Sequence, residues 1–201
     1  ASTHPGLKRS QNEDAFEANA ELGLWLVADG VGGHAFGDVA SALVAATVTE
    51  AHARGEELVG ALHGAHQAVL EEIGRRDESL GMGATVVAFT LTGKHYHLAW
   101  VGDSRAYLWN GEHLELLSHD HTHVADLVDR GLISQAEAAR HPERHVLTQS
   151  VGVFANMQLA PGERRGTLAL GEQILLCSDG LNDELSDQAI AAQLRGNNSC
   201  Q

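Results

Sequence analysis

The chain has 201 residues, 43% of them hydrophobic, and carries 27 acidic against 13 basic residues for a formal net charge of −14 at pH 7. This charge argues against a nucleic acid or an anionic membrane surface as partner, and no apolar run approaches the roughly 18 residues that span a bilayer. The length suits a single domain over residues 1–201. Two cysteines, Cys177 and Cys200, supply no disulfide framework or zinc cage and favour a reducing, cytoplasmic setting.

The first chemically informative segment is KRSQNEDAF, residues 8–16, which places Arg9 just ahead of the adjacent carboxylates Glu13 and Asp14. It can hold an anion-binding and a cation-binding group together, although a mixed charge run alone is usually a solvated surface. The apolar run LWLVADGVGGH, residues 24–34, follows and stops at Asp29. It predicts a buried strand that delivers Asp29 into a turn, where Gly30 allows close approach of other backbone.

Regular elements are predicted along the rest of the chain. Apolar spacings of three and four residues predict helices over 38–50 and 56–73. Alternating runs over 81–91, 94–109 and 113–117, separated by turns at 92–93 and 110–111, predict antiparallel strands. Short helices are predicted over 124–131 and 134–140, weak strands over 147–152, 157–159 and 167–170, and a last helix over 187–194.

Residues 118–123, SHDHTH, place histidines on alternate positions, at 119, 121 and 123. Such a spacing can chelate a transition metal, and the alternative is a polar loop after a strand. Beyond them, residues 124–146 interrupt the sheet pattern, and we expect an excursion beside the site. Within it, Ser134 and Glu137 have the spacing of a capping box.

Three strand ends share one design, in which an apolar run leads through a small residue to an aspartate: Asp29, Asp103 and Asp179. If these ends converge, the carboxylates repel one another or raise each other's pKa unless a cation neutralises them. Carboxylate and carbonyl oxygens select magnesium or manganese over zinc. Two such ions can activate a bridging water and hold a phosphoryl oxygen. With Arg9 available to bind phosphate, the pattern indicates hydrolysis of phosphomonoesters.

Seven segments resemble, in order, the motifs of the metal-dependent 2C-type Ser/Thr protein phosphatases: RSQNEDA, VADGVGGH, GMGATVV, VGDSRAYL, DHT, LTQSVG and LLCSDGLND. The chain looks most like their compact single-domain bacterial branch. This resemblance implies an α+β fold, a four-layer α/β/β/α sandwich of two antiparallel sheets flanked by helices, with metal ions at one end between the sheets. Residues 124–146 would form the family's flap, a contact for the protein substrate.

The resemblance also implies a set of metal ligands. Asp29 would bridge two Mn²⁺ or Mg²⁺ ions, and the Gly30 carbonyl would join it on one of them. Asp179 would bind the other ion. Glu13 and Asp14 would bind directly or through metal-held water.

Four further positions match roles in the family. Asp103 and Asp183 correspond to ligands of a third, weaker ion. Arg9 would hold the substrate phosphate, and His34 would protonate the leaving alkoxide. A metal-activated water would be the nucleophile, and the substrates would be phosphoserine and phosphothreonine proteins modified by a bacterial Ser/Thr kinase.

The sequence departs from the family pattern in two places. Relatives end with an Asp-Asn motif on a late strand, whereas none of the 22 residues after Asp179 supplies it. We therefore expect this chain to lack the family's carboxy-terminal strand. Gln149 stands in LTQSVG where relatives commonly carry Arg, which predicts an altered surface near the flap.

Two other functions are compatible with parts of the sequence. A catalytically weak relative could act as a regulatory phosphoprotein-binding module, which the missing Asp-Asn motif motivates and the retained Arg9, Glu13, Asp14 and Asp103 oppose. A histidine-based zinc hydrolase would depend on His119 and His121 rather than on Asp29.

Overall fold

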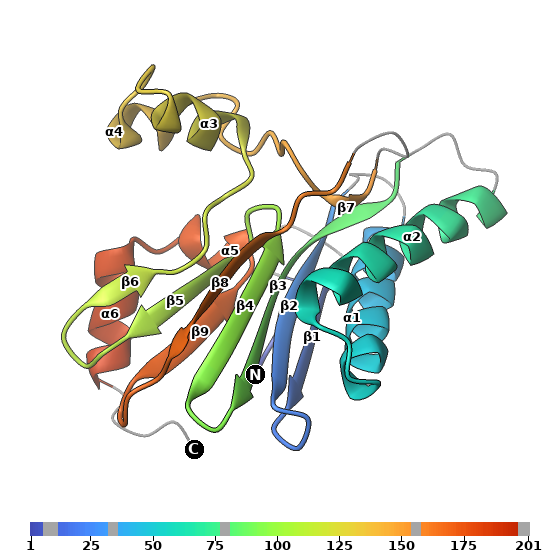
Figure 1. Ribbon diagram of the computed structural model, residues 1–201. Helices are drawn as coiled ribbons and strands as arrows, with labels where there is room; N and C mark the ends of the chain where they lie inside the picture. Colours follow the sequence, from blue (N-terminus) through green and yellow to red (C-terminus); the bar gives the residue numbers. More distant parts are fainter. Residues whose placement is uncertain (6–11, 32–35, 77–80, 154–157, 197–201) are drawn as a thin grey trace.

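Two antiparallel sheets with helices on their outer faces form the structure, a computed structural model that describes residues 1–5, 12–31, 36–76, 81–153 and 158–196 (Figure 1). The layers run helices, sheet, sheet, helices. This arrangement confirms the α+β four-layer sandwich that the motifs predicted.

The larger sheet, sheet A, consists of β1 (Asp14–Asn19), β2 (Leu24–Val31), β3 (Gly83–Thr92), β4 (His95–Val101) and β8 (Gly162–Thr167), in that order, with β7 (Val151–Gly152) paired to β3. In β2, buried and half-buried residues alternate, as expected for a strand with one face on the core. Sheet B contains β6 (Leu114–Leu116), β5 (Arg105–Trp109) and β9 (Gln173–Cys177). Each recorded strand pairing is antiparallel.

Two long helices, α1 (Gly37–Ala53) and α2 (Leu58–Arg76), cover the outer face of sheet A, and α5 (Asp179–Asn182) and α6 (Asp187–Gly196) lie against sheet B (Figure 1). The remaining helices, α3 (His123–Asp129) and α4 (Gln135–Ala138), stand away from the sheets in the segment predicted as the flap. The capping box at the start of α4 is present, with Ser134 and Glu137 each bonding the other's backbone.

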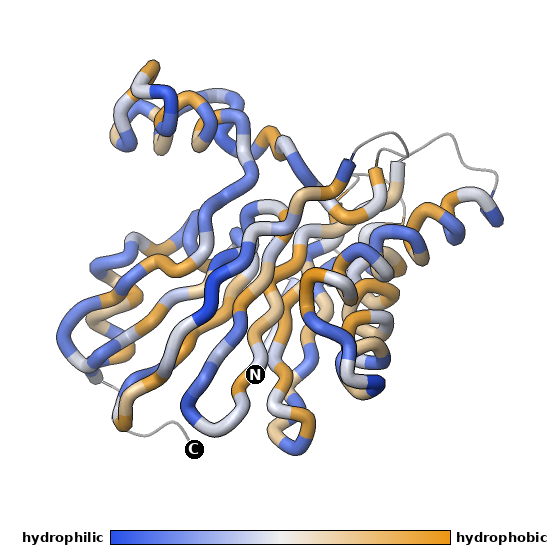
Figure 2. Tube along the Cα trace, viewed as in Figure 1, coloured by the Kyte–Doolittle hydropathy of each residue, from blue (hydrophilic) through white to orange (hydrophobic). Residues whose placement is uncertain are grey.

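The apolar residues form two cores, one on each side of sheet A. The first joins α1 and α2 to β2 and β3 and is made of aliphatic residues such as Leu26, Val44 and Leu62. The second lies between the sheets and contains aromatic residues, among them Phe89 and Tyr96, whose rings stack with centroids 5.5 Å apart. Figure 2 shows this apolar concentration in the central strands and a strongly hydrophilic stretch in β8.

Four local predictions differ from the structure. Asp29 lies inside β2, two residues before its end, rather than in a turn after it. β1 and α5 were not predicted, and of the weak strand over 147–152 only β7 forms. Of the weak strand predicted over 157–159, residue 157 lies outside the described residues and residues 158–159 form no strand. The weak strand predicted over 167–170 is replaced by β8, which ends at Thr167. The sequence of β8, GERRGT, has no apolar alternation because most of its residues are exposed at the sheet edge.

Among the described residues, we find no helix that combines the length and the apolar character required to cross a lipid bilayer.

Candidate metal centre

The predicted carboxylates come together at one end of the sandwich, between the two sheets. Asp29 on β2 pairs in register with Asp14 on β1. Asp103 lies in the turn between β4 and β5, and Asp179 is the first residue of α5, directly after β9. The Ser178 hydroxyl donates to Asp14 Oδ2 at 3.2 Å and so links the end of β9 to sheet A.

Burial and mutual repulsion shift the acidity of two of these carboxylates. Burial, followed by the negative charges of Asp179 and Asp14, raises the pKa of Asp29 from 3.8 to about 8. Burial, followed by the charges of Asp179 and Asp120, raises the pKa of Asp103 to about 7. At neutral pH the cluster therefore retains protons unless another cation takes their place.

The donor set fits a hard divalent cation. The converging groups offer only carboxylate and carbonyl oxygens, which are the ligands that Mg²⁺ and Mn²⁺ prefer. The pKa values of Asp29 and Asp103 are raised first by burial and then by repulsion from neighbouring carboxylates, so ionising the cluster is unfavourable. A cation would remove this repulsion.

The backbone around Gly30 is packed as closely as the sequence predicted. The Gly30 N–H donates to the Glu13 carbonyl oxygen at 3.0 Å. A Cβ atom at Gly30 would lie 2.2 Å from the Gly37 carbonyl oxygen, and one at Gly37 would lie 2.9 Å from Glu13 Oε1. β1, β2 and the start of α1 therefore meet at this corner, with no space for a side chain on Gly30 and with the Glu13 side chain against Gly37.

Replacing Gly30 by Ala is expected to lower the free energy of unfolding by about 1–3 kcal/mol, because the added methyl group overlaps backbone atoms that have no space to move. Urea unfolding measures the change. Gly64→Ala in α2 is the matched control: its Cβ meets nothing within 4 Å, and Ala stabilises a helix by up to about 1 kcal/mol relative to Gly. Equal stability of the two variants would contradict the close packing at Gly30.

A pocket of about 580 Å³ opens at this centre. Its polar walls come from β1, β2 and the β9–α5 junction and include Glu13, Asp14, Asp29, Ser178 and Asp179. Asp14, Asp29 and Asp179, from three separate parts of the chain, thus share one solvent-accessible cavity, while Asp103 and Asp183 line a second one.

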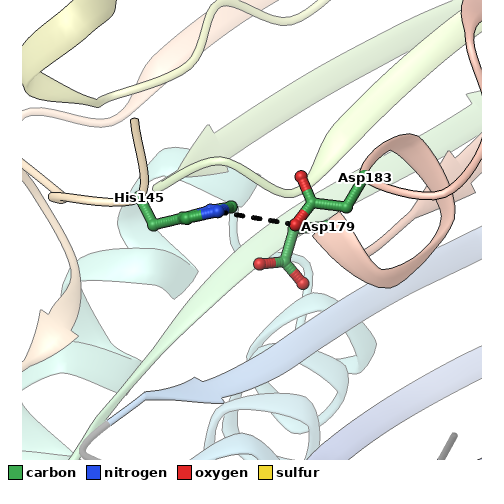
Figure 3. A group of neighbouring side chains, drawn as sticks. All are labelled: His145, Asp179 and Asp183. Carbon is green, nitrogen blue, oxygen red and sulfur yellow. Dashed lines mark ion pairs between the residues drawn. The ribbon is translucent and has the colours of Figure 1, made fainter. Parts of the chain in front are cut away.

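A second group of possible ligands adjoins the first. His145, Asp179 and Asp183 each offer a ligand atom, and these atoms all lie within 4.8 Å of one another; no other such group of three occurs within the described ranges. His145 Nε2 is 3.6 Å from Asp183 Oδ2 (Figure 3). Asp179 and Asp183 were predicted, but His145 was not, because a lone histidine in a polar stretch has no recognisable ligand spacing. It comes to the site on the segment that returns from the flap.

Sequence reasoning also missed the ion pair beside Asp103. Arg105 Nη2 and Asp120 Oδ2 are 2.6 Å apart, and Arg105 Nε lies 3.0 Å from Asp120 Oδ1. Arg105 also donates to the Tyr107 hydroxyl at 3.1 Å. This positive charge partly offsets the rise in the pKa of Asp103.

Two predicted residues lie outside the described part of the chain. Arg9 was predicted to hold phosphate, and His34 to protonate the leaving group. Both roles stay predictions.

The three alternate histidines do not form a chelate. His119 Nε2 lies 2.8 Å from an Asp129 oxygen, and His123 Nε2 lies 3.5 Å from Glu143. His121 Nδ1 accepts instead from a backbone N–H on the other side of the segment. Their rings bond to separate partners, and their ligand atoms do not all lie within 4.8 Å of one another, so the structure gives no support to a transition-metal site or to the zinc hydrolase.

A model of the family described as protein phosphatase 2C matches residues 7–196. The chain belongs to the protein phosphatase 2C family. It is 37% identical over 199 residues to the serine/threonine protein phosphatase PstP of Mycobacterium tuberculosis, an alignment that covers 94% of this chain and 37% of that protein. The chain thus spans little more than a third of the length of this relative.

Solved structures agree with the family assignment. The crystal structure of the Mycobacterium tuberculosis phosphatase PstP/Ppp is similar with a TM-score of 0.86 at 34% identity, over 96% of this chain and 82% of that one. The catalytic domain of PstP in complex with two manganese ions is similar with a TM-score of 0.82 at 33% identity, over 96% and 81% of the two chains. The family and the fold that the motifs predicted are confirmed.

Proposed function

We propose that this 2C-family chain removes phosphate from phosphoserine and phosphothreonine in proteins, with Mn²⁺ or Mg²⁺ as cofactor. The observation that carries the proposal is the convergence of Asp14, Asp29, Asp103 and Asp179 in a buried corner, where burial and then mutual repulsion raise the pKa of Asp29 to about 8 and that of Asp103 to about 7. Structural proteins rarely gather several carboxylates in an open pocket, whereas metal-dependent hydrolases require such a set.

We assign the ligands as the family resemblance implies. Asp29 would contact both ions, Asp179 one of them, and the Gly30 carbonyl the other, while Glu13 and Asp14 complete the set. The manganese complex of a similar catalytic domain supports two ions. The register pairing of Asp14 with Asp29 and the bond from Gly30 to Glu13 support placing these groups together.

A third, weaker ion is proposed at Asp103 and Asp183, which border one pocket of about 700 Å³ together with Asp179. Bound divalent cations supply Lewis acidity and lower the pKa of water, so that hydroxide becomes available as nucleophile at neutral pH. In this proposal Arg9 orients the substrate phosphate and His34 donates a proton to the departing serine or threonine oxygen.

The same proposal extends to biological context. The substrates would be proteins phosphorylated by a bacterial Ser/Thr kinase, and residues 1–201 would act as one catalytic domain with residues 124–146 as a flap. Gln149, near the flap, accepts a hydrogen bond from the Ala160 N–H at 2.8 Å. This contact supports a local structural effect, rather than an effect on the chemistry, of having Gln where relatives commonly carry Arg. Cys177 is a buried free thiol, which is compatible with a cytoplasmic location.

Hydrolysis of p-nitrophenyl phosphate and of a phosphothreonine peptide by the purified chain tests the activity. We expect both reactions to require Mn²⁺ or Mg²⁺, to stop with EDTA and to resume when the cation is restored in excess. A phosphotyrosine peptide serves as the comparison substrate, to test whether the chain prefers phosphothreonine over phosphotyrosine.

The outcomes separate the enzyme from a binding module. Turnover that survives EDTA would contradict metal dependence. A folded protein that binds Mn²⁺ and the phosphopeptide without hydrolysing either substrate would replace the phosphatase with the regulatory module.

A further inference from the structure

A histidine ring is buried between helix α2 and strand β7. His66 lies in the middle of α2 and is only 4% exposed, whereas His63, one turn earlier, is exposed. The Gly152 N–H on β7 donates to His66 Nδ1 at 3.0 Å. An imidazole nitrogen accepts a hydrogen bond only while it carries no proton, so the ring is neutral with its proton on Nε2. This contact between α2 and β7 therefore exists in one protonation state of His66.

The surroundings of the His66 ring oppose its protonation. Burial, followed by the charge of His63, lowers the pKa of His66 below its ordinary value of 6.5. The residues that α1, β3, β4 and β7 place in the core beneath α2 do not titrate; they include Val44, Val86, Val101 and Val151. A proton on Nδ1 would bring charge into this apolar core and would point a second N–H at the Gly152 N–H.

The backbone that the His66 ring holds is strained. Gly152 has φ +85°, and a Cβ atom on it would lie 2.6 Å from Val69 Cγ1, so β7 passes close against α2. The next residue, Val153, has φ +36°, a left-handed conformation that β-branched residues rarely adopt. Such a conformation persists only where the surrounding contacts impose it. Two hydrogen bonds do so here: from Gly152 to His66, and from the Val153 N–H to the Met82 carbonyl oxygen at 3.0 Å.

Strand β7 completes one corner of sheet A. It has two residues and pairs with Gly83 and Ala84 at the start of β3. On their other side, the same two residues of β3 pair with Val31 and Gly30 of β2. A strand this short forms too little ladder to hold its place by pairing alone. Loss of the His66 contact would therefore turn the start of β3 into an open edge beside the Gly30 corner.

We propose that His66 is an acid-sensitive latch, which holds β7 against α2 and β3 while the ring is neutral and releases β7 when the ring takes up a proton from solvent. The proton binds Nδ1, the nitrogen that accepts from Gly152, so protonation and the hydrogen bond exclude each other. The strain at Val153 favours release once that bond is lost. The latch goes beyond the proposed function, since it requires neither a bound cation nor turnover.

The effect of pH on β7 has a definite sign. Because the pKa of His66 is lower in the folded protein than in the unfolded chain, its stabilising contribution is fully present above about pH 6.5 and is lost as the pH falls through the folded-state value. Asp29 and Asp103 act in the opposite direction: their pKa values are raised, so acidification favours the folded state. A loss of β7 in acid therefore cannot come from these carboxylates.

Hydrogen exchange of the full chain from about pH 7.5 to about pH 5, corrected for the intrinsic effect of pH on exchange, tests the latch. In the wild type, protection at residues 151–153 should fall about five- to tenfold more than protection in the middle of α1, which corresponds to the loss of one hydrogen bond. His66→Asn keeps an acceptor that does not titrate, so its protection at 151–153 should follow that of α1. His66→Leu has no acceptor and should lack this protection even at neutral pH.

Nitrogen NMR of the histidine rings gives a second readout, which a merely structural role of His66 would not produce. At neutral pH the His66 ring should show an unprotonated Nδ1, and the midpoint of its titration should coincide with the midpoint of the lost protection at residues 151–153. His63→Asn is the matched control, because it makes the same substitution one turn earlier on α2 at an exposed position. It should keep the pH dependence and move its midpoint slightly upward, since the charge of His63 lowers the pKa of His66.

Three results would overturn the latch: a proton on Nδ1 of His66 at neutral pH, an equal pH dependence at residues 151–153 in wild type and His66→Asn, or loss of that dependence in His63→Asn. Circular dichroism checks that each variant folds. If His66→Asn does not fold, the wild-type chain carries the test, and a difference of more than about one pH unit between the two midpoints would count against the latch.

Discussion

Asp29→Asn is expected to stabilise the metal-free protein while abolishing the proposed phosphatase activity. The folded-state pKa of Asp29, about 8, lies above its ordinary value of 3.8, so ionising this carboxyl group costs stability increasingly as the pH rises from about 4 to 8. Asn carries no charge and avoids this cost. We expect its free energy of unfolding at pH 8 to exceed that of wild type by about 2–3 kcal/mol. Mn²⁺-dependent hydrolysis should fall at least about a thousandfold, because the variant loses the carboxylate that we propose both ions share.

Thermal unfolding in EDTA and in Mn²⁺ measures both effects. The unfolding temperature of the wild type should rise when Mn²⁺ is added. Asp29→Asn should have a higher unfolding temperature than the wild type in EDTA, and Mn²⁺ should raise it little further. Asp38→Asn, in the first turn of α1, is a control for the same chemical change at an exposed position and should alter stability by about 0.5 kcal/mol or less. A lower unfolding temperature for Asp29→Asn in EDTA would show that the carboxylates do not repel one another as inferred.

The main elements of the fold could be predicted because their residues repeat with the period of their own secondary structure. In β2 and β3 apolar side chains face a core, and in α1 and α2 they recur along one face. β8 could not be predicted in this way, since its pairing with β4 is made by the backbone of an exposed polar edge strand. Tertiary pairing alone makes GERRGT a strand.

The site was predictable where each residue carries its own local signal. Asp29, Asp103 and Asp179 each follow an apolar run in a similar local sequence, and the structure brings their carboxylates close enough, in a buried corner, to shift the pKa of two of them. His145 and the Arg105–Asp120 pair have no such signal. They reach the centre through the path of the flap and the register of sheet B, which are properties of the assembled fold.

The pH dependence of Mn²⁺ binding should be steep below pH 8. Mn²⁺ competes with protons held by Asp29, with pKa about 8, and Asp103, with pKa about 7. Lowering the pH from 8 to 6 should therefore weaken binding by about a hundredfold or more, since up to two protons must leave for the cation to bind. Isothermal titration with Mn²⁺ at several pH values measures this slope, and a flat profile would contradict the raised pKa values.

The number of protons released identifies the carboxylates responsible. At pH 7 Asp29 is mostly protonated and Asp103 partly protonated, so Mn²⁺ binding should release between about one and two protons, measured from the dependence of the binding enthalpy on the ionisation enthalpy of the buffer. Asp103→Asn should lower the release to about one proton and leave a steep slope between pH 6 and pH 8.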